Sequence, residues 1–600
     1  DLAHLERLID EYYQAQSLDP SRLKAIQTSI TQLLKTSHLE VDLGITSQTL
    51  GQWLTQADGY LCELKEAQIR DGLHIFGCCP EGEQLRDLIV AIARHPSLGR
   101  LGLIPSLAKD LGQEAEGKAI AVLESKANYL VETLLQNQIL PPLGPHTQGE
   151  IDWIEKTLIP SLRQTNQEIT HLLQGLAGQY IPSGGSGAPT RGRPDVLPTG
   201  RNFYSVDVRG IPTQTAWDVG RKAAETLIER YTQDNGEYPK TLAISIWGTS
   251  TMRTGGDDVS QVLALLGVQP IWEGISGRVI GYEILTPSAL GRPRVDVTIR
   301  VSGFFRDSFP SILFLLNCAI NEVACQEEDA EINPLAAQVQ TDKEFWQLQG
   351  LTEAHAKERA TYRVFGSKPG AYGAGLQGLM ESQNWETDED IAKAYINSSC
   401  YAYDGQGMGH TLPEVFSQRV QQLQIVLQNQ DNREHDLLDS DDYYQFQGGL
   451  IASVRALTGK NPQAYFGDNA NPNNPQVRTL SAEILRVYRS RVINPKWIKG
   501  VMRHGYKGAF EMAATVDYLF AYDATARCVE DFVYEGVAQA YLFDDQVREF
   551  IQAKNPWALR DMGERLLEAH QRGLWEQASE QTLDHLRAII HEAEGVIEEG

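Results

Sequence analysis

A stretch rich in glycine, proline and serine, IPSGGSGAPTRGRPDVLPTG at residues 181–200, separates two parts of the chain with different patterns. Such a composition is typical of a loop or linker, because few of its side chains can be buried in a core. Before it, apolar residues recur at helical spacing, as in 23–34 and 85–92, and they predict a helical domain over residues 1–180. A chain of 600 residues is too long for one hydrophobic core, so several domains are expected.

After residue 200, short β-rich runs alternate with helical patterns. The run TLAISIW at 241–247 is followed by a helical pattern at 257–266, and VDVTIRV at 295–301 alternates like a strand. This alternation predicts an α/β domain over residues 201–345. Residues 346–600 are mostly helical in pattern and contain glycine-rich loops. We therefore expect a mixed α/β, multidomain fold that is mostly helical with a central α/β unit.

The composition is that of an ordinary globular protein with a strong acidic excess. Hydrophobic residues make up 42% and charged residues 22%, which excludes a disordered or collagen-like chain. With 53 basic and 79 acidic residues, the chain is a poor nucleic-acid binder as a whole. Its longest apolar run, Ile312–Ile320, is broken by Asn317 and is far shorter than the ~20 residues that span a bilayer. Seven cysteines without a C-x-x-C pair predict reduced thiols and a cytoplasmic protein.

Charge is unevenly distributed near the C-terminal end of the sequence. Residues 473–507 contain eight basic residues and a single acidic one, whereas 510–600 contain seven basic and nineteen acidic residues. One interpretation is a solvated helix face that pairs with the acidic tail. The other is a binding site for anions such as carboxylates or phosphates.

Two glycine motifs resemble nucleotide-binding loops but lack essential features. The segment Gly112–Ala119, GQEAEGKA, has alanine where a P-loop needs a hydroxyl for Mg²⁺, and two glutamates where phosphates would lie. The segment Gly373–Gly378, GAGLQG, does not directly follow a predicted strand, as a dinucleotide fingerprint requires. We therefore expect no nucleotide site on this chain.

The segment NPKWIKGVMRHGYKGAFE at residues 494–511 contains the most noteworthy histidine. Asn494–Pro495 suits a helix start, with asparagine as the cap and proline in the first turn. At helical spacing Trp497 and His504 share a face, and Glu511 lies on the same side if the helix continues through two glycines. A histidine beside aromatic residues is commonly a core residue, so a structural and a functional imidazole both remain possible.

Five long segments resemble one protein family, and the resemblance covers nearly all 600 residues. They are LPTGRNFYSVD (197–207), SIWGTSTMRTGGDD (245–258), VSGFFRDSFP (301–310), RVFGSKPGAYGAGL (363–376) and NPKWIKGVMRHGYKGAFEMAATVDYLFAYDAT (494–525). They are similar to the large subunit of aerobic cobaltochelatase, the CobN type, within the family that also contains the large subunit of magnesium chelatase. Members of that family are considerably longer, so the chain is expected to be a C-terminal part that lacks an upstream H-G-x-H-E-type motif.

The resemblance implies ATP-dependent insertion of Co²⁺ into hydrogenobyrinic acid a,c-diamide during cobalamin biosynthesis. It also implies that ATP-Mg²⁺ is bound and hydrolysed by separate AAA+ ATPase motor subunits, not by this chain. Two alternatives remain: insertion of Mg²⁺ into protoporphyrin IX, as by the large (H-type) component of a magnesium chelatase, or a non-catalytic tetrapyrrole-binding or scaffold fragment.

The resemblance further implies roles for individual residues. His504 is expected to bind Co²⁺ and hand it over, or to accept a ring proton, with Glu511 as a second base. Basic side chains are expected to bind the peripheral carboxylates of the macrocycle, bidentately where they are arginines: Arg478, Arg489, Arg491 and Lys496. Aromatic side chains are expected to make flat contacts with the ring: Trp247, Trp497 and Tyr506.

Overall fold

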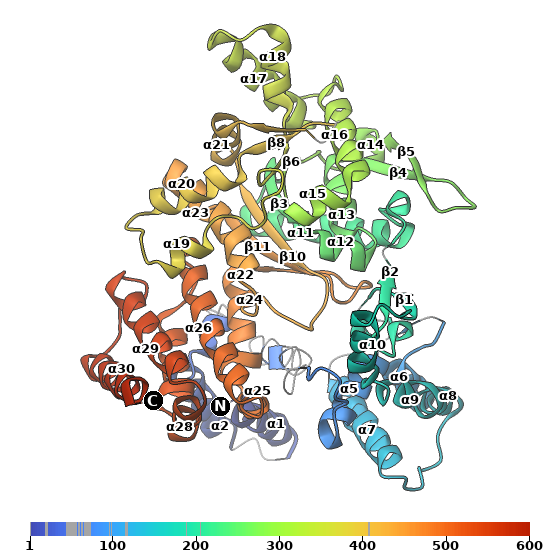
Figure 1. Ribbon diagram of the computed structural model, residues 1–600, viewed down its shortest axis with the longest axis vertical. Coiled ribbons are helices and arrows are strands. Elements are labelled where there is room, and N and C mark those ends of the chain that lie inside the picture. The colour runs from blue at the N-terminus through green and yellow to red at the C-terminus, as the bar shows by residue number, and fades with distance from the viewer. Residues whose placement is uncertain are drawn as a thin grey trace.

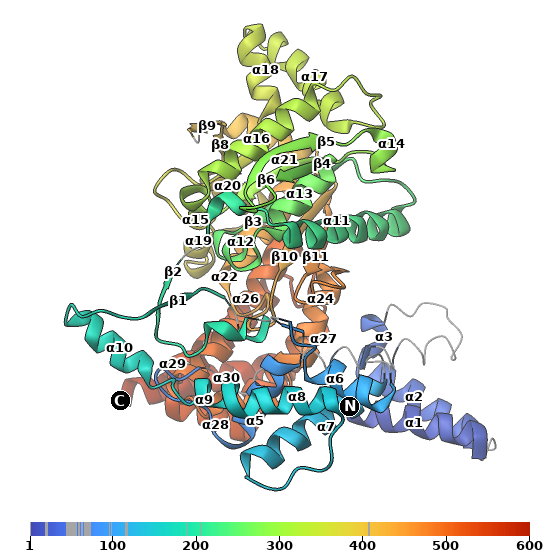
Figure 2. The same cartoon turned by 90° about the vertical axis from the view of Figure 1, so that its right-hand side faces the viewer.

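The computed structural model describes residues 2–18, 22–43, 57, 60–61, 64, 74–94, 96–97, 99–113, 118–187, 189–191, 193–204, 206–405 and 408–599. Figure 1 shows a sheet-containing part at the top and two groups of helices below it. The C-terminal helices, in orange and red, lie at the lower left, and most of the N-terminal helices, in blue and teal, lie at the lower right. Figure 2, turned by 90°, shows the same division into an upper sheet and a lower helical layer.

The N-terminal helices form two separate apolar cores within the described residues. The first includes Leu5, Ile30 and Leu39. It is built from α1 (Leu2–Leu18), α2 (Leu23–Thr36) and α3 (Leu39–Asp42). The second extends from Leu85 to Leu197. The helices of this second region are α5 (Gly82–Ala93), α6 (Leu103–Leu111), α7 (Lys118–Leu135), α8 (Pro145–Trp153), α9 (Ile159–Leu162) and α10 (Gln167–Leu176). The described part of 1–180 consists mainly of helices, and its buried apolar residues are divided between two cores.

The glycine- and proline-rich stretch at 181–200 contains short elements instead of a bare linker. β1 (Ser183–Gly185) pairs in parallel with β2 (Asn202–Tyr204), just beyond the stretch. Short 3₁₀ turns at Pro189–Arg191 and Pro194–Val196 lie between the two strands. The described residues of the stretch thus form short elements between the second helical core and the sheet.

Within the described residues, eight strands form one sheet in the order β12–β11–β10–β3–β6–β7–β8–β9. Their bounds are β3 (Thr241–Ile246), β6 (Asp296–Val301), β7 (Val364–Gly366), β8 (Tyr401–Tyr403), β9 (Gly409–Thr411), β10 (Ile425–Gln430), β11 (Gln463–Asp468) and β12 (Gln476–Thr479). The strands from β11 to β7 run parallel, and β12, β8 and β9 add antiparallel edges. Every residue of β3, β6 and β10 is buried, as expected of parallel strands covered by helices on both faces.

The strand order reverses between β3 and β10. From β3 the chain continues through α12 (Gly248–Thr254) and α13 (Asp257–Leu266) to β6, and later to β7 on the same side. β10 and β11 come later in the sequence and lie on the other side of β3. In open α/β sheets, ligands bind outside the carboxyl ends of the strands at such a switch point.

One continuous apolar core extends from Ile211 to Ala593 and joins the sheet to the C-terminal helices. Helices that belong to this core near the sheet are α11 (Gln214–Asn235), α16 (Pro310–Ala324), α20 (Asp388–Ser399), α21 (Pro413–Gln421) and α23 (Gly449–Thr458). The C-terminal helices are α24 (Leu480–Val487), α25 (Pro495–Met502), α26 (Tyr506–Ala526), α27 (Asp531–Val537), α28 (Asp545–Lys554), α29 (Pro556–Gln571) and α30 (Glu580–Glu599). The sheet takes strands from both sides of residue 345, so the α/β unit extends further along the chain than the predicted range 201–345.

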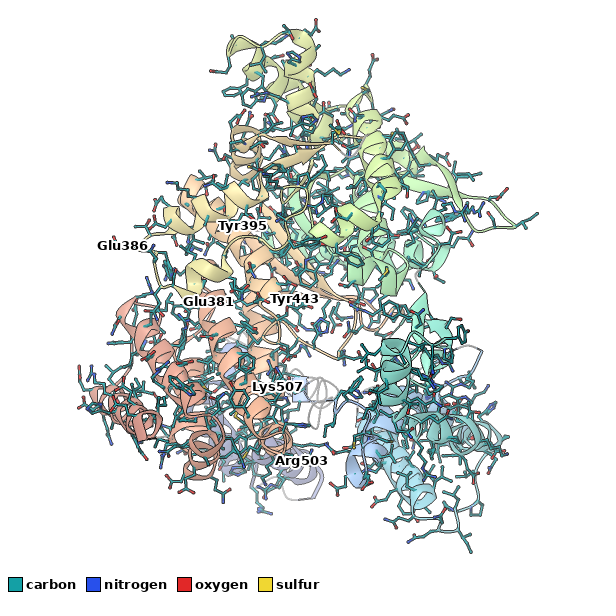
Figure 3. The ribbon with its side chains drawn as sticks, in the orientation of Figure 1. Glu381, Glu386, Tyr395, Tyr443, Arg503 and Lys507 are labelled. Atoms are coloured by element: carbon teal, nitrogen blue, oxygen red, sulfur yellow. The ribbon has the colours of Figure 1, made fainter. Side chains whose placement is uncertain are left out.

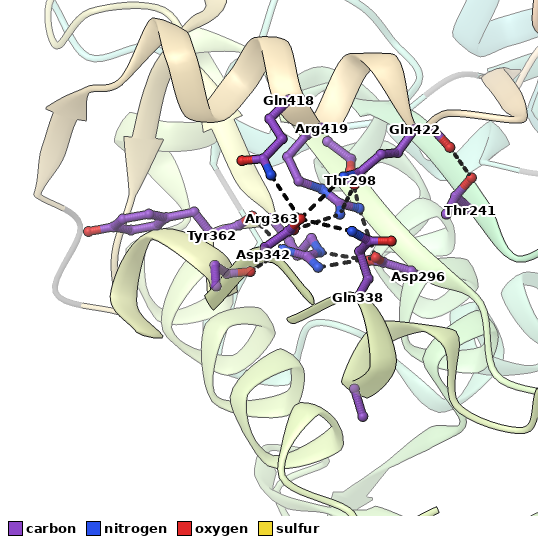
Figure 4. A network of polar contacts seen from close by, with 12 residues as sticks. Thr241, Asp296, Thr298, Gln338, Asp342, Tyr362, Arg363, Gln418, Arg419 and Gln422 are labelled. Carbon is purple, nitrogen blue, oxygen red and sulfur yellow. Dashed lines mark hydrogen bonds and ion pairs between the residues drawn. The ribbon is translucent and has the colours of Figure 1, made fainter. Parts of the chain in front are cut away.

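A buried network of charges holds the helical hairpin at the top of the molecule to the sheet (Figure 4). Asp296, at the start of β6, accepts hydrogen bonds from Arg363 at 2.6 and 3.1 Å and from Arg419 of α21 at 2.8 Å. Arg419 also lies 3.7 Å from Asp342 of α17 (Pro334–Leu348), which forms the hairpin with α18 (Glu353–Thr361). The two carboxylates balance the two guanidinium groups, which permits this burial of charge.

The expected fold class, a mostly helical multidomain α/β protein with a central α/β unit, is confirmed. Across the described ranges, none of the helices has both the length and the apolarity needed to cross a bilayer.

Candidate active site

A cavity of about 280 Å³ lies at the switch point, outside the carboxyl ends of β3 and β10. Its walls are the residues that follow β3, the start of α13, the last residues of β10 and the loop from Asp431 to α22 (Asp441–Tyr443). Figure 3 places Tyr443, at the end of this loop, near the lower end of the sheet. The cavity therefore occupies the place where the fold is expected to bind a ligand.

Paired polar side chains fix the two walls against each other. Arg253 of α12 donates two hydrogen bonds to Asp431, at 2.5 and 2.8 Å, and so ties the segment after β3 to the segment after β10. Asn429 of β10 donates to Asp258 of α13 at 2.8 Å and to Gln261 at 2.7 Å. Bidentate and charge-assisted bonds of this kind hold side chains in defined orientations.

The aromatic wall of the cavity consists of Trp247 and Tyr443. Their rings meet edge to face with centroids 4.8 Å apart, and Trp247 also contacts Phe446 at 5.8 Å. The indole Nε1 of Trp247 is buried and has no hydrogen-bond partner among the residues that the structure describes. The hydroxyl of Tyr443 lies 3.2 Å from Nε2 of His435, a hydrogen bond whose donor depends on the imidazole tautomer. A flat apolar surface thus adjoins an imidazole and several carboxylates.

The carboxyl group of Asp442, one of the cavity residues, has a raised pKa. Its surface reaches solvent, yet protein atoms crowd the carboxyl group. Desolvation, and then the negative charge of neighbouring Asp441, raise the pKa of Asp442 to about 6. A carboxyl group with a pKa near the working pH can both accept and release a proton, which is the requirement for a general base.

Arg491, one of the predicted substrate-binding residues, instead anchors the loop that forms one wall. It donates to Asp436 at 2.5 and 2.9 Å and to Thr515 of α26 at 3.0 Å, and it lies 3.5 Å from Asp439, which lines the cavity. Burial lowers the pKa of Arg491, but Asp436 and Asp439 outweigh burial and raise it. The guanidinium group is therefore permanently charged and engaged within the chain.

The other basic residues predicted to bind carboxylates are also paired with acids of this chain. Arg489 is buried and donates to Asp42 of α3 at 3.0 and 3.1 Å. Arg478 lies 3.5 Å from Asp468, and Lys496 lies 2.9 Å from Asp87 of α5. These acidic partners lie upstream of the acidic tail. The pairing therefore matches neither the interpretation as a solvated helix face paired with the tail nor the interpretation as an anion-binding site. Of the predicted basic residues, Lys496 has an exposed side chain.

The helix-start prediction at 494–511 is confirmed, whereas the predicted functional residues there lie apart from the cavity. Asn494 caps α25 by accepting from Lys496 N at 2.9 Å. α25 ends at Met502, and His504 lies in the turn before α26, where burial and then Arg503 lower its pKa. Figure 3 shows Arg503 and Lys507, which flank His504, well below Tyr443.

The remaining predicted residues have distinct environments. Trp497 is buried under the Arg491 guanidinium, 4.9 Å from its ring centroid, so it is a core residue. Tyr506 is 61% exposed, and Glu511 pairs with Lys507 at 2.5 Å. Among the nine predicted site residues, all within the described part of the chain, Trp247 alone lines the cavity.

Several cavity residues had not been predicted from the sequence. They are Arg253, Asp431, His435, Asp442 and Tyr443. The sequence does contain a feature that could have indicated these residues. The buried strand IVLQNQ changes from apolar to polar residues along its length, and the acidic run DNREHDLLDSDD follows it. Among the residues that the structure describes, no three His, Cys, Asp or Glu side chains are arranged to hold a metal ion.

The chain is an α/β protein with a mostly parallel, doubly wound sheet, and its polar cavity lies at the switch point where proteins of this class bind ligands. A family model described as CobN/Magnesium Chelatase matches residues 1–582. Aerobic cobaltochelatase subunit CobN of Pseudomonas aeruginosa is 47% identical over 98% of this chain and 50% of that protein. The solved catalytic subunit of cobaltochelatase from Mycobacterium tuberculosis has a TM-score of 0.93 and 44% identity, over 99% of this chain and 51% of that one.

A more distant relative, the H-type magnesium-chelatase protein of Chlorobaculum parvum, is 28% identical over 100% of this chain and 49% of that protein. The chain therefore belongs to the CobN/Magnesium Chelatase family, as the resemblance of its motifs indicated. It spans about half the length of the relatives it matches.

Proposed function

We propose that this chain forms the tetrapyrrole-handling part of a cobaltochelatase, which inserts Co²⁺ into hydrogenobyrinic acid a,c-diamide on the route to cobalamin. The observation that carries the proposal is the switch-point cavity with its aromatic and carboxylate walls, in a chain 47% identical to a CobN subunit. The chain is 28% identical to the Chlorobaculum parvum magnesium-chelatase protein and 47% identical to the CobN subunit. This difference in identity favours cobalt over magnesium as the substrate metal.

The chemistry of insertion matches the residue types of the cavity. As Co²⁺ binds the four nitrogens of the corrin, which has a single inner N–H, that N–H bond breaks and its proton must pass to a base. Asp442, with its pKa raised to about 6, suits the role of this acceptor. His435 and Asp439 provide an imidazole and a carboxylate, donor types that Co²⁺ accepts, for transient contact with the ion during its transfer.

The ring is proposed to contact the indole of Trp247 and to extend beyond the cavity. A volume of about 280 Å³ lies at the lower end of the ~300–1,000 Å³ typical of ligand pockets, so it accommodates an edge of a macrocycle. Exposed Tyr506, Lys507 and Lys496 are candidates for contacts with the outer part of the ring and its carboxylates. His504 and Glu511 keep their proposed roles only if the ring reaches the start of α26.

The energy source is proposed to lie on other subunits. AAA+ ATPase motor subunits would bind and hydrolyse ATP-Mg²⁺, and this chain would supply the ring site. The sequence supports that division, since the P-loop-like segment at 112–119 lacks the required hydroxyl, although its residues 114–117 lie outside the described part of the chain. The acidic composition and scattered thiols support a cytoplasmic location.

A fluorescence-quenching titration tests the proposal. The chain is titrated with hydrogenobyrinic acid a,c-diamide and, in parallel, with protoporphyrin IX. We expect a micromolar Kd for the corrin precursor and binding of the porphyrin at least about tenfold weaker, a difference of ~1.4 kcal/mol. Preference for the porphyrin would support the magnesium alternative, and binding of neither would support a scaffold fragment. Cobalt insertion that proceeds without added ATPase subunits would contradict the proposed partners.

A further inference from the structure

Helix α10 exposes a continuous apolar face. Side chains at positions i, i+3, i+4 and i+7 lie on one side of the helix: Ile169, Leu172, Leu173 and Leu176, which are 45%, 50%, 60% and 77% exposed. Figure 2 shows α10 and the chain after it extending away from the rest of the molecule. Single exposed leucines are ordinary on a protein surface, but a contiguous apolar row marks an interaction site.

The turn at residues 74–78 extends this face. Gly77 packs so closely on Ile169 that a Cβ at Gly77 would lie 2.4 Å from its Cδ1. Glu168, the buried first-turn residue of α10, accepts from Gly77 N at 2.7 Å and lies 3.0 Å from His74 Nε2. Ile75 and Phe76 on the same turn are 54% and 55% exposed. We call these two residues and the four of α10 the α10 face.

The opposite side of α10 is fixed to the chain. His171 Nδ1 lies 2.6 Å from Gly200 O, and a Cβ at Gly200 would lie 2.7 Å from Glu168 N. The helix is therefore held in place by its polar side, while its apolar side faces outward. A helix that is held by its polar side and exposes its apolar side is the arrangement expected of an amphipathic helix whose apolar side is covered by a partner.

We propose that the α10 face binds the half of the family's full-length polypeptide that this chain does not match. The solved Mycobacterium tuberculosis subunit contains nearly the whole of this fold in 51% of its chain, so that protein has a comparable length of polypeptide outside the shared part. Interfaces between domains bury apolar surface of this kind over roughly 600–1,500 Å². The proposed occupant is that unmatched half, which would present an apolar surface complementary to the α10 face.

Other occupants fit the observations less well. A second copy of this chain carries a net charge of −26, which opposes self-association. The tetrapyrrole has a more suitable place in the switch-point cavity, whose lining residues do not include α10. The α10 face also contains no basic side chain for the carboxylates of the macrocycle.

Site-resolved cysteine labelling tests the occupant. Leu173→Cys is made in this chain, and the matched residue is changed to cysteine in the full-length Pseudomonas aeruginosa relative. Labelling rates with a maleimide are read by peptide mass spectrometry, because Cys78 and Cys325 are also exposed. We expect position 173 to react at least tenfold more slowly in the full-length protein. The control, Leu348→Cys on the α17–α18 hairpin, where Leu348 is 86% exposed, is expected to react at similar rates in both.

Equal rates at position 173 in the two proteins would overturn the proposal. Protection that grows with the concentration of this chain alone would assign the face to a second copy and also overturn it. Protection that requires added hydrogenobyrinic acid a,c-diamide would assign the α10 face to the tetrapyrrole and would also overturn the proposal. These outcomes are independent of the proposed cobalt chemistry, because none of them requires metal or turnover.

Discussion

Arg491 donates two hydrogen bonds to Asp436, at 2.5 and 2.9 Å, and thereby fixes the loop that carries the cavity residues His435 and Asp439. The arginine comes from the basic segment that suggested a binding site for anions. The guanidinium charge is paired with carboxylates inside the protein, and this pairing holds one wall of the cavity in place. Through Arg491, the basic segment thus supports the structure of the candidate site.

Loss of this anchor is expected to destabilise the C-terminal half strongly. Arg491→Met removes the guanidinium partner of Asp436 and leaves a buried carboxylate, so we expect a loss of about 3–5 kcal/mol. Urea unfolding followed by tryptophan fluorescence measures it. The double variant Arg491→Met/Asp436→Leu should recover part of the loss. Arg587→Met on α30, whose side chain is 55% exposed, is the matched control and is expected to change stability by less than about 0.5 kcal/mol. Equal urea midpoints for Arg491→Met and wild type would contradict the role of Arg491 in holding this loop.

Asp442 is expected to make stability depend on pH. Its folded pKa of about 6 lies above the ~3.9 of an unfolded aspartate, so ionisation costs the folded state free energy as pH rises through that window. Asp442→Asn removes this cost. We expect the melting temperature to rise by about 1–2 °C at pH 8 and to stay unchanged at pH 4, a small effect because the group reaches solvent. The same shift at both pH values would show that Asp442 titrates normally.

His504 is expected to be neutral at pH 7. Burial and then the charge of Arg503 lower its pKa, so protonation on acidification opposes folding and its midpoint lies below the ordinary 6.5. Proton NMR of the histidine ring measures the midpoint, with His504→Gln for assignment. Arg503→Gln is expected to move the midpoint upward. A midpoint above 6.5 in the unmodified chain would be the contrary result.

The apolar residues of α10 are expected to contribute little to the stability of this chain. Leu172→Glu/Leu173→Glu changes two side chains that are at least half exposed, so the melting temperature should stay within about 1 °C. Leu107→Glu on α6, where the side chain is 5% exposed, buries a charge and should unfold that region. Differential scanning fluorimetry compares the two. A large loss in the α10 variant would mean that these leucines are already buried in solution.

The strands that build the sheet could be predicted in part from the sequence. TLAISI and DVTIRV are short, β-branched and entirely buried, and they form β3 and β6 as their pattern indicated. IVLQNQ was not predicted, because half of its residues are polar and a buried parallel strand is normally apolar. Its polar half lies at the carboxyl end, where the cavity requires polar groups.

The candidate site was harder to predict, because strand order decides its position. Trp247 and Asp431 are 184 positions apart, and only the placement of β10 beside β3 brings the residues that follow the two strands into one cavity. Counting the charged residues along the sequence identifies the basic segment but does not identify the acidic residues that pair with it. Asp42, Asp87 and Asp436, which neutralise it, are distant in sequence from the arginines and lysine that they bind.

The most direct test of the proposed ring site compares two variants in one titration. Hydrogenobyrinic acid a,c-diamide is titrated into wild type, Trp247→Phe and His504→Ala, with Trp557→Phe on the exposed surface of α29 as the control for lost tryptophan signal. If the ring contacts the switch-point cavity, Trp247→Phe should weaken binding by about tenfold, while His504→Ala and Trp557→Phe bind like wild type. Weaker binding by His504→Ala with unchanged binding by Trp247→Phe would place the ring at the start of α26 and contradict the cavity as its site.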